Sequence, residues 1–262
     1  MPTFLVKKAL FSAFLIFSVS FAHAQDAVPD CRLPGAAEPV TIAAVSDGDT
    51  VRLQDGRRVR LLGFGALEVD REHPERSSAL ALEAKKTLQW LVPKASPVSL
   101  LTDKEKYDVH GRTLAQLIRA DGRDVAQTLL EQGLAHTYIF PPNDFLWRCY
   151  QRYENTARAK SRGLWQLPQF QLQAATTVRA GASGYQILQG QVSGYRKRGD
   201  ALTVVLDTRI FVHIRGENAA RFVGIWSLPA VGQPLAVRGV LNWRQGKGHL
   251  DLRHPQALVL NP

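Results

Sequence analysis

The order of short apolar runs constrains the fold of this chain more than any other feature. Strictly alternating or β-branched runs predict strands, whereas apolar residues at helical spacing, such as Leu80, Ala84 and Leu88, predict a helix. In the first half of the chain, strand-like runs fall at 41–45, 50–53, 58–64, 98–101 and 113–118, and the helical period falls at 77–91. Five short strands with a helix after the third are typical of a five-stranded OB-type barrel.

Two more helices are expected after this barrel. Asp124 can cap a helix that runs to Glu131, and Gly133 is a suitable C-terminal stop. A last helix is predicted over 143–161, with Gly163 as its stop. The first domain is therefore predicted to be a β-rich α+β unit.

The second half of the chain repeats the order of strands and helix. Strands are predicted at 185–192, 202–206, 211–214, 234–242, 249–252 and 257–260, with a short helix at 217–223. This order predicts a second OB-like β-barrel. The intervening 168–184 is rich in Gln, Ala, Thr and Gly and is interpreted as a linker. The expected organisation is a tail at 25–37, a barrel domain at 38–167, this linker, and a basic domain at 185–262.

The first 24 residues are interpreted as a signal peptide. Lys7 and Lys8 precede an apolar stretch at 9–22, and Ala22-His23-Ala24 fits a signal peptidase site. We therefore expect a periplasmic or secreted protein, with an uncleaved anchor as the alternative. Cys31 and Cys149 are the two cysteines of the chain. An oxidising compartment permits one disulfide between them, but sequence spacing leaves two free thiols equally open.

The positive charge is concentrated near the C-terminus. The chain has a formal net charge of +10. Residues 173–262 carry 11 Lys and Arg against 4 Asp and Glu, a net charge of +7, whereas 25–172 carry 20 against 19. This excess favours an acidic partner for the second domain and leaves the first domain nearly neutral.

A set of polar residues in the first domain fits phosphodiester hydrolysis. That reaction needs cations to hold the phosphate and a carboxylate to orient or deprotonate water. Asp47 and Asp49 lie in a turn, Arg60 lies on the third strand, Glu68 follows it, and Arg112 precedes the fifth strand. Singly, each is most simply a solvated surface charge, so the interpretation depends on their order and spacing.

Several motifs share one order and spacing with a known family. They are Asp47-Gly48-Asp49-Thr50-Val51, Arg60-Leu61-Leu62-Gly63, Glu68, His110-Gly111-Arg112-Thr113-Leu114-Ala115, Gln132-Gly133-Leu134-Ala135, Tyr138 and Ser161-Arg162-Gly163-Leu164-Trp165. With them, residues 38–167 resemble the thermonuclease, or staphylococcal nuclease-like, family. The resemblance implies an OB-type fold and a calcium-dependent nuclease that acts on DNA or RNA.

The resemblance also implies roles for single residues. Arg60 and Arg112 would grip the scissile phosphate and Glu68 would activate water, which makes these three the candidate catalytic residues. Asp49 would be a calcium ligand. Tyr138 would flank the nucleotide, and His110 would stack on a base or remain a surface-loop histidine.

The sequence departs from the family pattern at the metal site. After Arg60-Leu61-Leu62-Gly63 the family has a hydrophobic residue, Asp, Thr or Ala, Pro and then Glu, whereas Gly65 and Leu67 stand here for the Asp and the Pro. Calcium requires six to eight oxygen ligands, so the loss of a carboxylate predicts a weakened calcium site. Asp47 or Asp70 would have to compensate. Two hypotheses follow: a weakened or differently metallated nuclease, or a degenerate homologue that binds nucleic acid or the cell envelope.

The second domain carries two basic turns with aromatic neighbours. The candidate nucleic-acid-binding residues there are Arg196, Lys197, Arg198, Trp243 and Arg244. OB barrels bind single strands with such cations and aromatics. The alternatives are solvated hairpin tips, an anionic cell-surface polymer, or another protein. His213, His249 and His254 have no metal-ligand spacing and are expected to be structural or exposed.

Overall fold

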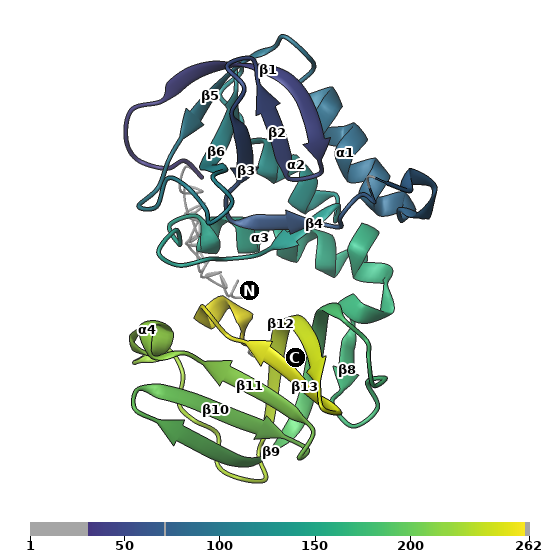
Figure 1. The fold of residues 1–262 in the computed structure, drawn as a ribbon, viewed down its shortest axis with the longest axis vertical. Coiled ribbons are helices and arrows are strands. Elements are labelled where there is room, and N and C mark those ends of the chain that lie inside the picture. Colours follow the sequence, from purple (N-terminus) through teal and green to yellow (C-terminus); the bar gives the residue numbers. More distant parts are fainter. Residues whose placement is uncertain (1–30, 71, 260–262) are drawn as a thin grey trace, which may run out of the picture. The chain divides into compact units, whose positions relative to one another are not determined.

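The alternating runs of the first half form a closed barrel in the computed structural model, which describes residues 31–70 and 72–259 (Figure 1). Its strands are β1 (Glu38–Asp47), β2 (Thr50–Leu53), β3 (Arg58–Leu61), β5 (Pro97–Leu101) and β6 (Thr113–Arg119). β1 pairs with both β2 and β5, and β3 pairs with β6 in parallel. The predicted five-stranded OB-type barrel is confirmed.

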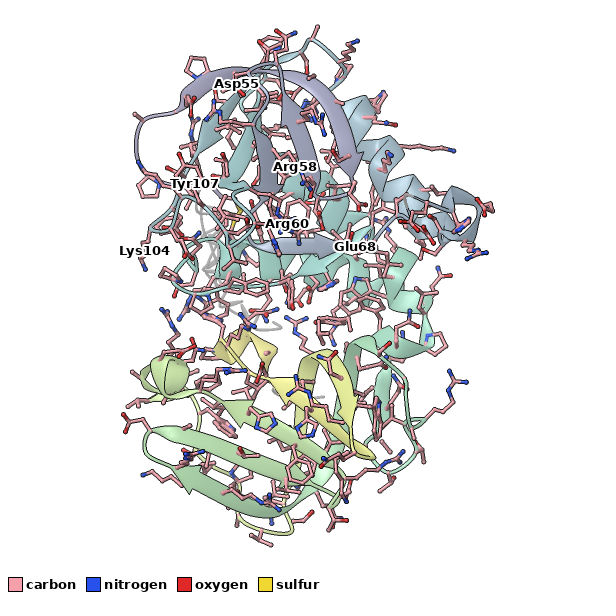
Figure 2. All side chains as sticks on the ribbon, in the orientation of Figure 1. Asp55, Arg58, Arg60, Glu68, Lys104 and Tyr107 are labelled. Atoms are coloured by element: carbon pink, nitrogen blue, oxygen red, sulfur yellow. A yellow bond between two sulfur atoms is a disulfide. The ribbon has the colours of Figure 1, made fainter. Side chains whose placement is uncertain are left out.

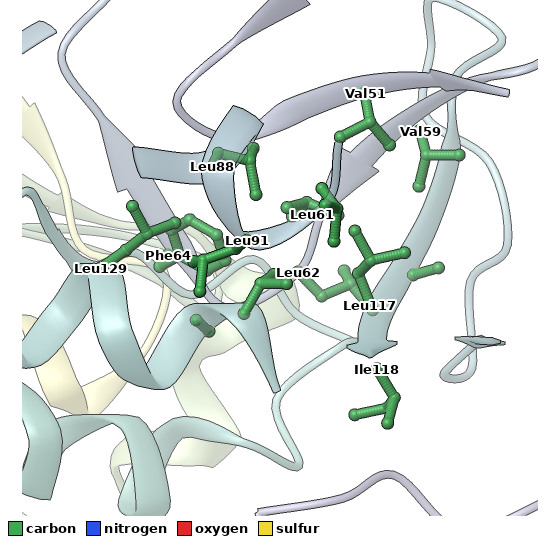
Figure 3. Packing of buried hydrophobic residues seen from close by; sticks show 14 of the residues in the cluster. Val51, Val59, Leu61, Leu62, Phe64, Leu88, Leu91, Leu117, Ile118 and Leu129 are labelled. Carbon is green, nitrogen blue, oxygen red and sulfur yellow. The ribbon is translucent and has the colours of Figure 1, made fainter. Parts of the chain in front are cut away.

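Helices close one end of this barrel. α1 (Ala79–Leu91) is capped by the Ser78 side chain, and α2 (Val125–Glu131) is capped by Asp124. Figure 3 shows Leu88 of α1 and Leu129 of α2 among the leucines of the barrel core. Each such side chain, once fully buried, stabilises the fold by about 1.5–3 kcal/mol. The short 3-10 turns of the first half are Pro74–Arg76 and Gly163–Gln166.

The predicted strand at 58–64 is two strands. The chain turns at Gly63, whose φ of +82° suits glycine and whose Cβ would meet the Tyr150 ring at 2.7 Å. β4 (Phe64–Ala66) then leaves the barrel and pairs with β7 (Ala135–Thr137). This separate two-stranded ribbon carries the loop that leads to Glu68.

The last helix of the first half starts later than predicted. α3 is Trp147–Ala159, not 143–161. Asn143 instead bonds across to the main chain of Glu105 through both its side-chain oxygen and its side-chain nitrogen, each at 2.8 Å. Those bonds compete with helix formation, as is common for asparagine.

The second half forms a second β-domain. Its strands are β8 (Leu172–Ala174), β9 (Gly184–Arg198), β10 (Ala201–Leu206), β11 (Ile210–Ile214), β12 (Pro234–Arg244) and β13 (Lys247–Asp251), with α4 (Gly216–Ala219) and the 3-10 turn Ala220–Phe222 after β11. β9 pairs with β10 and β12, and β11 pairs with β13 in parallel. The strands β9, β10, β11, β13 and β12 pair in the same cyclic order as β1, β2, β3, β6 and β5 of the first barrel, and β8 is added beside β9.

The predicted closing strand at 257–260 is wrong for its described part. A 3-10 turn spans Pro255–Ala257, started by the His254 side chain, and Leu258 makes a single bridge to Val237. A proline donates no ladder hydrogen bond and suits the first turn of a helix, which explains the difference.

The segment predicted as a linker is packed. Residues 168–184 contain the 3-10 turn Pro168–Phe170 and strand β8. Ala175 and Val178 are buried in the core of the second domain. The chain between the barrels therefore has little freedom, and the exact domain limits stay a prediction.

A buried polar cluster joins the second domain to the first. Arg238 of β12 and Glu154 of α3 form an ion pair with side chains only 3% and 0% exposed. Glu154 also accepts hydrogen bonds from the backbone N–H and the hydroxyl of Thr137, both at 2.6 Å. Burial alone would raise the pKa of Glu154, but Arg238 and these hydrogen bonds hold it below its ordinary value.

The predicted signal peptide lies outside the described residues. None of the helices in the described part of the chain is long and apolar enough to cross a membrane. Cys31 and Cys149 form a disulfide, with their Cα atoms 5.7 Å apart. It ties the start of the described chain to α3.

Loss of this disulfide should destabilise the first domain strongly. The bond closes a loop of 118 residues, for which the entropic estimate is about 4–5 kcal/mol. We expect Cys31→Ser to unfold at a lower denaturant concentration than the wild type in oxidising buffer. In reducing buffer the two proteins should unfold alike, and a difference that persists there would contradict the prediction.

Replacing one partner of the buried ion pair should lower the free energy of unfolding more than replacing both partners. Arg238→Met leaves Glu154 charged and buried, and we expect the free energy of unfolding to fall by about 3–5 kcal/mol. Arg238→Met combined with Glu154→Leu should recover most of that loss in urea unfolding. Because the pKa of Glu154 is lowered by folding, its contribution is present above the ordinary value of 4.5 and is lost in stronger acid. The wild type should therefore lose stability below about pH 4.5 more steeply than the double variant.

Candidate active site

The site begins at the turn between β1 and β2. Gly48 sits there because a Cβ would lie 2.6 Å from the Ala66 Cβ and 2.8 Å from the Ala84 Cβ. This close approach places the turn against both β4 and α1. It also buries the carboxylates on either side, since Asp47 is 2% and Asp49 3% exposed.

The carboxylate of Asp49 is paired with an arginine side chain. It forms an ion pair with Arg60, and Thr50 on β2 is the register partner of Arg60 on β3. Its carboxylate also accepts hydrogen bonds from the Thr50 hydroxyl and the Ala66 N–H, both at 3.0 Å. Arg60 Nη2 donates to the Phe64 carbonyl at 3.2 Å. A guanidinium has five N–H donors, so Arg60 keeps donors for a phosphate.

Neighbouring charged residues of the site change the pKa of Arg60. Burial and the positive charge of Arg112 lower the pKa of Arg60 to about 10, against the opposing effects of Glu68 and Asp47. Figure 2 shows Arg60 and Glu68 on the same side of the barrel, beside β4. Arg60 stays protonated near neutral pH, and a phosphate between the two arginines would relieve their mutual repulsion.

A tight turn holds the side chain of Arg112 in position. Its backbone N–H and its Nε donate to the two carboxylate oxygens of Asp108, at 2.9 and 2.6 Å. Burial would raise the pKa of Asp108, but these bonds and the His110 N–H hold it low. His110 itself is exposed on the same turn, so its position fits a surface residue as well as a base-stacking one.

The replaced positions of the family pattern have new neighbours. Gly65 is the register partner of His136 in the β4–β7 ribbon. Burial lowers the pKa of His136 to about 4, so this imidazole is neutral near pH 7. Leu67, which stands for the proline, packs against the cluster around Trp165 and Phe170. The approach to Glu68 is therefore held by apolar contacts.

The residues present lack part of the calcium site that the family pattern implies. Asp47 accepts the backbone N–H of Gly48 at 2.8 Å and that of Val69 at 3.4 Å. Asp70 accepts the N–H groups of Glu72 and His73, so it caps its own turn. Within residues 31–70 and 72–259, no group of three or more His, Cys, Asp or Glu side chains could hold a metal ion.

Tyr138 connects this site to the second domain. Its N–H donates to the Gly63 carbonyl at 3.0 Å, and its ring contacts Phe140 and Tyr185 at centroid distances of 4.6 and 6.5 Å. A negative charge on Tyr138 would raise the pKa of Arg60. The predicted nucleotide-flanking role of Tyr138 stays a prediction.

The candidate residues of the second domain separate into two groups. Arg196 and Arg244 line one hollow on the outer face of the barrel, whereas Lys197 and Arg198 are exposed at the end of β9. Trp243 packs at the second core, and its Nε1 donates to the Ala182 carbonyl at 2.7 Å. Arg209 covers its ring at 5.1 Å, so this tryptophan already has contacts on that face.

Three aromatic residues near these cations were missed as candidates. Phe211 and His213 on β11 alternate with buried residues, and so does His249 on β13. That alternation was a usable signal, because it turns all three to the outer face. Their mutual contact depends on the parallel register of β11 and β13, which pairs Phe211 with His249. Sequence spacing does not contain that register.

Comparison with known proteins identifies the first domain. Residues 58–167 match the family model described as Staphylococcal nuclease homologue. This part of the chain is a staphylococcal nuclease homologue domain. The matched stretch includes Arg60, Glu68, Arg112 and Tyr138, and it also includes Gly65.

Relatives of this nuclease homologue domain are named as endonucleases. The chain is 27% identical over 130 residues to the SPbeta prophage-derived endonuclease YokF of Bacillus subtilis (strain 168), which covers 48% of this chain and 43% of that protein. It is 28% identical over 127 residues to an uncharacterized endonuclease of Escherichia coli O157:H7, which covers 47% of this chain and 74% of that protein. The chain thus spans less than half the length of the Bacillus relative.

Restoring the missing carboxylate should strengthen calcium binding. A Cβ at Gly65 would lie 3.5 Å from His136 Nε2 and 3.6 Å from Arg60 Nη2, which are ordinary contacts. We expect calcium to raise the thermal unfolding midpoint of Gly65→Asp by about 3–5 °C at a tenfold excess over its Kd. The matched control is Gly65→Asn, which has nearly the same volume without the charge. An equal calcium shift in the wild type would contradict the prediction.

Proposed function

We propose that this chain hydrolyses phosphodiester bonds in DNA or RNA, with calcium bound weakly. The observation that carries the proposal is that the charges of Arg112 and Glu68 both act on Arg60, in a staphylococcal nuclease homologue domain. Two guanidinium groups and a carboxylate are what the reaction needs from the protein. The names of the endonuclease relatives support the same reaction.

Each of the three side chains has a distinct part in the proposed reaction. Arg60 and Arg112 donate hydrogen bonds to the non-bridging phosphate oxygens and stabilise the charge that builds up on them. Glu68 accepts a proton from water as the water oxygen bonds to phosphorus. The bond from phosphorus to the leaving oxygen breaks, and that oxygen takes a proton from solvent. Asp108 and Asp49 hold the two arginines in position.

A binding protein without catalysis is the second candidate. It is favoured by the ion pair between Asp49 and Arg60, which occupies the carboxylate that the family pattern assigns to calcium. The glycine at position 65 favours it too. In that case the cleft would hold a nucleic-acid strand, or an anionic polymer of the cell envelope, without cutting it.

The proposed location is the periplasm or the extracellular space. The basic, apolar and small-residue pattern of the first 24 residues supports export. The disulfide between Cys31 and Cys149 also supports it, because such bonds persist in oxidising compartments.

The decisive experiment is the release of acid-soluble nucleotides from denatured DNA and from RNA. We expect the wild type to release nucleotides, with weak stimulation by calcium and partial loss in EDTA. Glu68→Gln should lower the rate about 100-fold or more, because it removes the proton acceptor. Glu83→Gln on the exposed face of α1 is the matched control and should be fully active.

Two outcomes would overturn hydrolysis. One is a wild type that binds denatured DNA but releases no nucleotides with calcium or EDTA, which would leave the binding protein. The other is a Glu68→Gln variant as active as Glu83→Gln, which would show that the cleavage comes from elsewhere.

A further inference from the structure

A groove runs over the outer face of the second barrel and begins at the nuclease domain. Its first part is a cavity of about 550 Å³ that is lined by Thr137, Tyr138 and Ile139 of the first domain and by strands β10 to β13 of the second. A second hollow of about 570 Å³ lies on the same strands. The two share Thr203, His213, Arg244 and His249, so they form one continuous groove.

The groove is positively charged. Arg215, Arg244 and Arg253 line its first part, and Arg196 and Lys247 line its second part. Asp251 is the one acidic residue among the lining residues, and it is paired with Arg215 at 3.2 Å. Such a lining complements a chain of phosphates.

Phe211, His213 and His249 form an aromatic surface on the floor of the groove. The rings of His213 and His249 are joined by a 2.9 Å hydrogen bond and lie within 4° of parallel. A ring-to-ring hydrogen bond at that angle requires the rings to lie edge to edge, in about the same plane. Phe211 packs against His249, with the ring centres 5.4 Å apart and the ring planes at 24°, and Arg196 lies 5.1 Å over the Phe211 ring.

The register of the strands holds this surface in place. Thr203 is the register partner of both His213 and Arg196, and its hydroxyl lies 3.0 Å from His213 Nδ1. Burial lowers the pKa of His213 and of His249, so the pair is neutral near pH 7. The two imidazoles therefore offer ring faces and hydrogen-bonding atoms, while the arginines around them supply the charge.

We propose that this groove binds a single strand of nucleic acid, with bases stacked on the surface formed by Phe211, His213 and His249 and phosphates held by Arg196 and Arg244. Only unpaired bases offer a free face for stacking, which commits the groove to single strands over duplexes. Tyr138 lines the groove, and its backbone N–H donates to the carbonyl of Gly63, three residues after Arg60. This hydrogen bond places the start of the groove beside the nuclease site, so one strand could occupy both.

This inference deepens the proposed function, because the identity of the strand as substrate rests on it. The binding claim is separate: the groove can hold a strand whether or not the first domain cuts it. The experiment therefore measures binding and cleavage independently.

The test is fluorescence anisotropy of a labelled mixed-sequence single-stranded DNA and of the matching duplex, with the full chain carrying Glu68→Gln to suppress cleavage. We expect the single strand to bind more tightly than the duplex. His213→Ala with His249→Ala should weaken single-strand binding about tenfold or more, since stacked bases are lost. His213→Phe should keep most of the affinity, because it retains a flat ring.

Charge is tested separately from stacking. Arg244→Ala removes an exposed side chain and should reduce the slope of log affinity against log salt by about one. Arg123→Ala removes an equally charged, exposed arginine from the first domain and should leave binding unchanged. Far-UV circular dichroism and thermal unfolding verify that each variant is folded.

Defined outcomes would overturn the proposal. They are single-strand affinity unchanged in the histidine double variant and in Arg244→Ala, or a duplex that binds as tightly as the single strand. By contrast, tight single-strand binding that the groove variants weaken, in a wild type without nuclease activity, would overturn hydrolysis and leave the groove intact.

Discussion

The buried pair of Arg238 and Glu154 is the interaction on which the arrangement of the two domains depends. Each side chain is almost fully buried, and each comes from a different domain. An ion pair of this kind contributes little net stability over an apolar contact, yet separating its partners is costly because each charge would remain buried. It therefore acts on position. It holds β12 against α3 and β7. Tyr138 follows β7 directly and is thereby kept in the lining of the groove.

Both barrels could be predicted because their information is local. Strand alternation, a helical period between the third and fourth strands, and caps such as Asp124 all lie within a few residues of one another. The failures came where a distant contact decides. The chain turns at Gly63, where the ring of Tyr150 from α3 packs closely. Asn143 lies outside the helix because its side chain bonds to the main chain of Glu105. Neither partner is visible from the local pattern.

The sequence predicts which residues form the candidate active site, but it does not predict how they are bonded. The motifs predict Arg60, Glu68 and Arg112 as the catalytic residues, which stays a prediction, and Gly65 marks where the family pattern breaks. The sequence did not indicate that Asp49 would form an ion pair with Arg60. It also did not indicate that a buried histidine, His136, would face position 65 across the ribbon. Both contacts depend on strand register, which one sequence does not contain.

In the proposed function, the two halves of the chain divide the requirements of one substrate. The first domain is nearly neutral, and the arginines of its candidate site are held in place by Asp49 and Asp108, as the proposed action on one phosphate requires. The second domain carries the charge excess and an aromatic surface, which suit many weak contacts along a strand. The weak calcium site proposed for the first domain would make such capture more important, because a slow site gains most from substrate that stays in place. Tyr138, which contacts the second domain and lies near Arg60, is where the two requirements meet.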